Sequence, residues 1–236
     1  MKIIAIIPAR YDSTRFPGKP LIDLKGKTMI QRVYERVDSS QAFDQVLVAT
    51  DDERIYNHVL SWGGEVVMTQ NTHVSGTDRC AEVLQKNDAH WVVNIQGDEP
   101  LIDQTLLKEI SKELKSGNSE IVSAYRAIDQ QEAQDPNVVK VVMSDSGRAL
   151  YFSRSIIPFE RNKQELPYYQ HIGVYGFSAN TLAKLAQLPA SKLENKEGLE
   201  QLRWLSNDYS IKMLPTSYQS IAIDTPEDVE KVVQRL

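Results

Sequence analysis

Short runs of isoleucine and valine alternate with segments of helical period through the first half of the chain. The runs that predict strands are Lys2–Ile7, Gln45–Thr50, Glu65–Met68, Trp91–Ile95 and Glu120–Arg126. Between them apolar residues recur at helical spacing, for example at Met29, Val33 and Val37. Strands that alternate with helices form βαβ units, so the sequence predicts an α/β fold. We expect a mostly parallel, Rossmann-like sheet flanked by helices, with ligands at the carboxyl ends of its strands.

After about Asn137 the strands come closer together, which predicts an appended antiparallel lobe. Its expected strands are Val138–Met143, Arg148–Phe152 and His171–Phe177, with a turn at Asp145-Ser-Gly147. The remaining expected elements are helices at Asn180–Leu188 and near Gly198–Ser206, strands at Ile211–Leu214 and Ser220–Ile223, and a terminal helix from about Pro226. Neither a repeat nor a flexible linker interrupts the pattern, so we expect one domain over residues 1–236.

Composition narrows the classes of function. The net charge of −5 argues against nucleic-acid binding, so a polyanionic ligand needs a local basic cluster. No window approaches the roughly 20 apolar residues of a membrane span, and the N-terminal apolar run stops at Pro8. The single cysteine and four scattered histidines do not suggest a Cys/His metal cluster. We therefore expect a cytoplasmic protein without a membrane or nucleic-acid partner.

The turn that leaves the first strand is the most informative stretch. It places Arg10, Arg15 and Lys19 within ten residues, and three cations at a strand end suit a triphosphate. Ser13, Thr14 and the backbone N–H groups near Gly18 add donors to phosphate oxygens. The alternative is a solvated loop that happens to be basic.

Two familiar phosphate motifs are imitated or absent. Gly26-Lys27-Thr28 resembles the end of a Walker A loop, but the first glycine of that pattern falls on Leu21. The G-x-G-x-x-G fingerprint is missing after the first strand, which disfavours NAD and FAD.

Two carboxylates are candidate ligands for Mg²⁺. Asp98 follows the fourth predicted strand, where a hard cation on a nucleotide phosphate would lie. Asp224 ends the late predicted strand and precedes Thr225-Pro226, which reads as a helix start. Asp224 therefore has an alternative role as a helix-entry residue only.

Weaker candidates surround this site. The small-residue turn Ser75-Gly76-Thr77 opens the third helix and offers N–H groups to a nucleotide. His171 and Tyr175 alternate along a predicted strand and could face a sugar, although a hydrogen-bonded structural histidine is an equal alternative. Glu200-Gln201 could bind a polyol, and a solvated helix face explains them nearly as well.

These strings occur, in order, in one known family. They are Ile7-Pro-Ala-Arg10, Ser13-Thr-Arg-Phe-Pro-Gly-Lys-Pro-Leu21, Ala49-Thr-Asp51, Gly63-Gly64, Met68-Thr69, Ser75-Gly-Thr77, Asn94-Ile-Gln-Gly-Asp-Glu-Pro100, Leu150-Tyr-Phe-Ser-Arg154, His171-Ile-Gly-Val-Tyr175, Leu199-Glu-Gln-Leu-Arg203 and Asp224-Thr-Pro-Glu-Asp228. Over nearly its whole length the chain resembles the 3-deoxy-manno-octulosonate cytidylyltransferase (CMP-Kdo synthetase) family. The resemblance implies a nucleotide-diphospho-sugar-transferase-like fold, a homodimer, Mg²⁺, and transfer of CMP from CTP to the sugar acid Kdo for lipopolysaccharide.

The resemblance also implies roles along the chain. Residues about 1–136 form the nucleotide-binding half, and about 137–236 the half for sugar-acid binding and dimerisation. The implied nucleotide contacts are Pro8, Ala9, Arg10, Ser13, Arg15, Lys19, Ser75, Gly76, Thr77 and Gln96. The implied sugar-acid contacts are His171, Tyr175, Glu200 and Gln201. Catalysis is expected from Lys19, Asp98 and Arg15, with Asp98 and Asp224 on the metal.

One departure and three alternatives remain open. Ser178 stands where related sequences often carry arginine, so a site that reads the distal end of the sugar could accept the 8-amino analogue of Kdo. A glycosyltransferase of similar fold usually needs an Asp-x-Asp metal motif, and Gln96-Gly97-Asp98 lacks its first carboxylate. A non-catalytic nucleotide-binding regulator would keep the basic loop but has no use for a metal pair.

Overall fold

The sheet of the protein joins strands from both halves of the chain. The computed structural model describes residues 1–12, 16–161 and 167–236. Its strands are β1 (Ile3–Ala9), β2 (Gln45–Thr50), β3 (Val66–Met68), β4 (Trp91–Asn94), β5 (Ile121–Ile128), β6 (Lys140–Met143), β7 (Ala149–Ser153), β8 (Tyr168–Ser178) and β9 (Ile211–Pro215). Its helices are η1 (Lys19–Leu21), α1 (Met29–Asp38), α2 (Glu53–Ser61), α3 (Gly76–Gln85), α4 (Gln104–Ser116), α5 (Gln130–Ala133), α6 (Ala179–Leu185), α7 (Lys192–Glu197), α8 (Gln201–Leu205) and α9 (Pro226–Val233). Each of these helices in the described ranges is too short or too polar to cross a bilayer.

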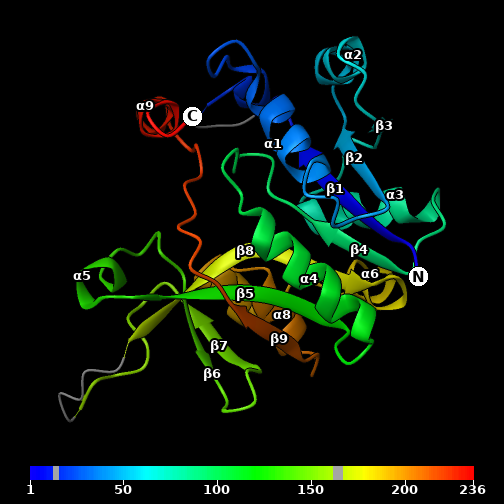
Figure 1. Ribbon diagram of the computed structural model, residues 1–236. Coiled ribbons are helices and arrows are strands. Elements are labelled where there is room, and N and C mark those ends of the chain that lie inside the picture. The colour runs from blue at the N-terminus through cyan, green and yellow to red at the C-terminus, as the bar shows by residue number, and fades with distance from the viewer. Residues whose placement is uncertain (13–15, 162–166) are drawn as a thin grey trace.

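The strand order is β3-β2-β1-β4-β8-β5-β9, with β6 and β7 beside this path (Figure 1). Strands β1 to β4 are parallel to one another, as the sequence predicts. Strand β8 is antiparallel to both of its neighbours, β4 and β5, while β9 is parallel to β5. Within this described path only β8 therefore runs in the opposite direction, and the predicted mostly parallel sheet is confirmed.

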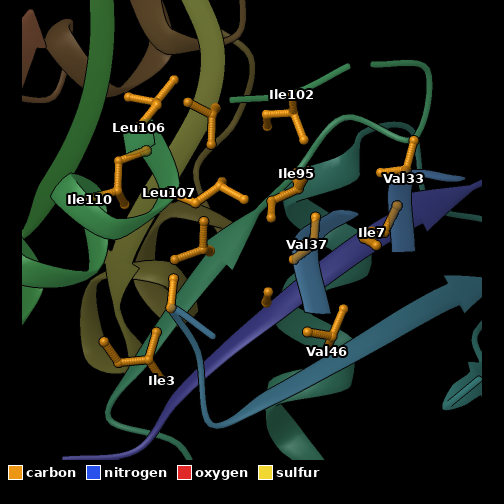
Figure 2. Packing of buried hydrophobic residues seen from close by; sticks show 14 of the residues in the cluster. Ile3, Ile7, Val33, Val37, Val46, Ile95, Ile102, Leu106, Leu107 and Ile110 are labelled. Carbon is orange, nitrogen blue, oxygen red and sulfur yellow. The ribbon is translucent and has the colours of Figure 1, made fainter. Parts of the chain in front are cut away.

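Alternation along β1 divides the core into two layers. Ile3, Ala5 and Ile7 join one buried cluster, which contains the apolar faces of α1 and α4. Ile4 and Ile6 join the other, which contains those of α3, α6 and α8. Figure 2 shows the first layer, where side chains of α1 and α4 pack over the sheet. A strand buried on both faces needs apolar residues at every position, which explains the continuous run at the N-terminus.

Strands β6 and β7 form the predicted hairpin. They pair antiparallel, and the turn closes where the Gly147 N–H donates to the Ser144 carbonyl at 2.8 Å. Gly147 has a φ of +75°, a conformation that favours glycine. Lys140 of β6 pairs with Gln170 of β8, which connects the hairpin to the main sheet.

In the last third of the chain one predicted strand is wrong and one helix was not predicted. Residues Ser220–Ile223 are extended but pair with no strand in the part of the chain that the structure describes. They pass the loop after β4 instead, where the Ile223 N–H donates to the Asp98 carbonyl at 3.0 Å. Helix α7 was not predicted because it buries no residue and so shows no apolar period. Its signal is the capping box of Ser191 and Glu194.

The loop after β4 approaches β1 so closely that glycine is required at position 97. A Cβ on Gly97 would lie 2.8 Å from the Pro8 carbonyl oxygen, a backbone atom that cannot turn aside. We expect Gly97→Ala to lower the free energy of unfolding by about 1–3 kcal/mol, measured by urea denaturation. In the control Gly173→Ala the new Cβ would meet Gln96 at 3.7 Å, an ordinary contact. Equal stability of the two variants would contradict this reading of the loop.

Candidate active site

A cavity of about 480 Å³ opens at the carboxyl ends of β1 and β4. Many of the predicted site residues line it: Pro8, Ala9, Arg10, Lys19, Ser75, Gly76, Gln96, Asp98, Tyr175, Glu200 and Asp224. Ser13, Thr14 and Arg15 lie outside the described residues, so the predictions about them stay predictions. The parallel topology explains the location, because these strand ends meet at one edge of the sheet.

Lys19 lies between two carboxylates from distant parts of the chain. Its Nζ atom is 2.7 Å from Asp98 Oδ2 and 3.4 Å from Asp224 Oδ1. The Lys19 side chain is only 14% exposed, so these carboxylates supply much of the polar surroundings that the ammonium loses on burial. The structure thus brings both predicted metal ligands to one point, although that point holds the Lys19 ammonium.

Tyr11, which follows β1, makes a cation–π contact with Arg54. The Arg54 guanidinium lies 3.2 Å from the centroid of the Tyr11 ring, and Asp52 binds the same guanidinium at 2.6 Å. The Tyr11 carbonyl accepts a 2.8 Å hydrogen bond from Gly18, whose φ is +72°. This hydrogen bond joins Tyr11 to the residue directly before η1.

Another part of the cavity wall has three buried polar atoms with no hydrogen-bond partner among the described residues. They are Asn94 Oδ1, Tyr175 Oη and Glu200 Oε1, and all three residues line the cavity. Asn94 and Tyr175 are register partners on β4 and β8. Burial raises the pKa of both the Tyr175 hydroxyl and the Glu200 carboxyl. Because buried polar groups are rarely left unpaired, this wall is suited to a ligand that carries hydroxyl groups.

Thr77 holds Glu200 rather than lining the cavity. Its Oγ1 donates to Glu200 Oε2 at 2.9 Å, and Ser75 caps α3 by accepting from the Asp78 N–H. The start of α3 and the start of α8 are thereby connected. The predicted nucleotide contact of Thr77 stays a prediction.

The residues of the cavity wall that were not among the predicted contacts are Asp12, Pro20, Met29, Arg79, Asn94 and Gly97. Arg79 is buried, and it donates to Asp51 at 2.9 Å and to the Thr69 hydroxyl. The strings Ala49-Thr-Asp51, Met68-Thr69 and Ser75 to Arg79 therefore meet at one guanidinium. All three strings were visible in the sequence, but only the fold shows that they share a partner.

His171 and Gln201 do not line the cavity as the described residues form it. The His171 Nε2 atom lies 3.0 Å from Ser123 Oγ, and its ring packs edge-on against Phe152 and beside Tyr175. Gln201 is buried on α8. The hydrogen-bonded structural alternative fits His171, while direct sugar contacts of both residues stay predictions.

Ser178 does not line the cavity that the described residues form. It pairs with Trp91 at the amino end of β4, whereas Asn94 at the other end faces the cavity. Its hydroxyl accepts from the Thr181 N–H as the N-cap of α6. The hypothesis that position 178 reads the distal end of the sugar is therefore wrong.

Comparison with known proteins gives the class of this chain. A family model described as cytidylyltransferase matches residues 4–213, and the chain belongs to this family. The 3-deoxy-manno-octulosonate cytidylyltransferase of Parabacteroides distasonis is 51% identical, over 99% of this chain and 97% of the relative. The 8-amino-3,8-dideoxy-manno-octulosonate cytidylyltransferase of Shewanella frigidimarina is 45% identical, over 100% and 99%.

A solved structure is similar over the full length of both chains. It is a CMP:2-keto-3-deoxy-manno-octonic acid synthetase in complex with CTP, with 40% identity, a TM-score of 0.96 and complete coverage of each chain. The predicted family and the predicted nucleotide-diphospho-sugar-transferase-like fold are confirmed.

The surroundings of His171 predict a pH dependence of stability. Burial lowers its pKa from 6.5 to about 3, so below pH 6.5 the unfolded chain takes up a proton that the folded chain rejects. Stability is therefore lost as the pH falls from 6.5 towards 3. We expect His171→Gln to lose less stability than wild type between pH 7 and about pH 4.5, by urea denaturation at each pH. Equal losses in both proteins would contradict a neutral, buried His171.

Proposed function

We propose that this protein transfers CMP from CTP to the anomeric hydroxyl of 3-deoxy-D-manno-octulosonate (Kdo), releasing pyrophosphate. One observation carries the proposal: a single cavity is lined both by Arg10 and Lys19 and by unpartnered polar atoms of Asn94, Tyr175 and Glu200. The two cations suit a triphosphate, and the unpartnered polar atoms suit a polyhydroxylated acid. The relatives named for this reaction and the CTP-bound neighbour support the same choice.

The reaction needs positioning and charge neutralisation more than covalent chemistry. The sugar oxygen attacks the α-phosphorus of CTP while the bond to the bridging oxygen of the β-phosphate breaks, and pyrophosphate leaves. Arg10 and Lys19 neutralise the triphosphate, and Arg15 is proposed to join them. The N–H groups at Ser75 and Gly76, with Gln96, are proposed to hold the nucleotide beside the acceptor.

The donor set fits Mg²⁺. Asp98 and Asp224 converge on one cationic group, and Mg²⁺ commonly takes one or two carboxylates together with phosphate and water oxygens. No cluster of three or more potential ligands occurs within residues 1–12, 16–161 and 167–236, so the nucleotide would complete the shell. We propose that Asp98 and Asp224 hold Mg²⁺, which supplies charge neutralisation at the phosphates.

Assembly and location belong to the same proposal. Leu150, Ile156 and Phe159 expose 51, 39 and 87% of their surface on and after the edge strand β7. An apolar edge in this half of the chain supports the homodimer that the resemblance implies. We propose a cytoplasmic enzyme that supplies activated Kdo to lipopolysaccharide synthesis; the 8-amino sugar is the alternative acceptor.

Pyrophosphate release tests the proposal directly. With CTP, Mg²⁺ and Kdo we expect release that depends on all three, and parallel assays with 8-amino-Kdo measure acceptor preference. Lys19→Ala should lower kcat/KM for CTP on the order of 10²–10³-fold, because a charge that stabilises the transition state is lost. The control Lys27→Ala removes an exposed lysine that pairs with Glu35, and should behave as wild type. Unchanged CTP kinetics in Lys19→Ala would refute the triphosphate assignment.

Metal dependence is tested by removing the ligands one at a time. EDTA should abolish pyrophosphate release, and added Mg²⁺ should restore it. Asp98→Asn and Asp224→Asn should each raise the Mg²⁺ requirement or abolish turnover, since each removes a charged oxygen ligand. The control Asp145→Asn lies exposed in the β6–β7 turn and should change neither. Full activity of Asp224→Asn at low Mg²⁺ would reduce that residue to a helix-entry group.

A further inference from the structure

An extended segment, residues 216–224, carries Asp224 from one half of the protein to the other. We call it the strap. It leaves β9, crosses the molecule and enters α9, as the orange to red trace of Figure 1 shows. Its first residue donates from the Thr216 N–H to the Tyr125 carbonyl at 2.8 Å. Beyond that point no described strand pairs with it, so its position depends on other contacts.

Glu99 makes side-chain contacts with the middle of the strap. Ser220 Oγ donates to Glu99 Oε1 at 2.7 Å, and the Tyr218 hydroxyl to Glu99 Oε2 at 3.3 Å. Glu99 is only 6% exposed, so both hydrogen bonds are shielded from water. Positions 218 and 220 of the strap are thereby joined to the residue directly after Asp98.

The strap returns to the same loop three residues later. The Ile223 N–H donates to the Asp98 carbonyl at 3.0 Å, and the next side chain, Asp224, reaches Lys19. A shift of the strap between Tyr218 and Ile223 would break one of these hydrogen bonds. The Glu99 contacts therefore help to determine the distance between the Asp98 and Asp224 carboxylates.

We propose that Glu99 is a positioning residue that holds the strap so that Asp224 meets Lys19 opposite Asp98. The proposal rests on the proposed function only for its kinetic consequence. The competing explanation is apolar packing, since Ile221 and Ile223 contact the cluster of Leu24, Met29 and Val232. If that packing alone places Asp224, removal of Glu99 leaves the strap where it is.

The test compares Glu99→Ala, Glu99→Gln and Gln219→Ala with wild type by two measurements. The first is amide hydrogen exchange of the strap in the protein without nucleotide or metal. The second is the Mg²⁺ concentration that gives half-maximal pyrophosphate release. Glu99→Ala should speed exchange in the strap and raise this concentration about 10- to 100-fold, the usual effect of losing a group that orients a metal ligand.

Two variants separate positioning from general damage. Glu99→Gln keeps an oxygen that accepts from Ser220 and should restore much of both properties. Gln219→Ala alters an exposed strap residue between the two contact positions, and should match wild type. Should Glu99→Ala fail to fold, Ser220→Ala removes the shorter contact alone and should shift both measurements in the same direction.

Several results would overturn the proposal. Wild-type exchange and Mg²⁺ requirement in folded Glu99→Ala would leave placement of Asp224 to apolar packing. Faster exchange throughout the sheet would mean general destabilisation. If wild type releases no pyrophosphate, the proposed function fails, whereas exchange in the strap still decides whether Glu99 positions it.

Discussion

The ammonium of Lys19 is a point at which three parts of the chain, far apart in sequence, meet. Asp98 lies 79 residues beyond it and Asp224 205 residues beyond it, yet both carboxylates contact its Nζ atom. A charge that is mostly shielded from water is costly unless other charges and dipoles replace the water. The loop after β4 and the strap therefore converge on the Lys19 cation, and the Glu99 and Ile223 contacts join the strap to the same loop. Side chains of all three parts of the chain line one cavity, at the carboxyl ends of β1 and β4.

Much of the first half of this arrangement could be predicted from the sequence. Strands β1 to β4 are short apolar runs, and the glycine and cation pattern between Arg10 and Lys19 needs no long-range knowledge. The strap could not be predicted, since Ser220–Ile223 has the composition of a strand and differs from one only in lacking a partner. Helix α7 lacks the apolar period on which such predictions depend. Local patterns thus predict most helices and strands, whereas tertiary packing decides which strands pair.

The position of β8 shows the same limit more sharply. Its sequence predicts a strand, but not that it enters the parallel sheet between β4 and β5 in the opposite direction. That insertion places Tyr175 beside Asn94 and moves Ser178 to the far end of the same pair of strands. Two residues three positions apart therefore have unrelated roles, one in the cavity wall and one as a helix cap. Register, which no composition reveals, decides which of them faces a ligand.

Two parts of the cavity lining come from different elements of the chain. The cationic part of the lining comes from residues that follow β1, and Lys19 there is paired with carboxylates of the protein. Another part comes from β4, β8 and the residue before α8, and it retains polar atoms that have no hydrogen-bond partner among the described residues. A change on β8 or α8 can therefore alter this part of the cavity lining while Lys19 and its carboxylates stay in place.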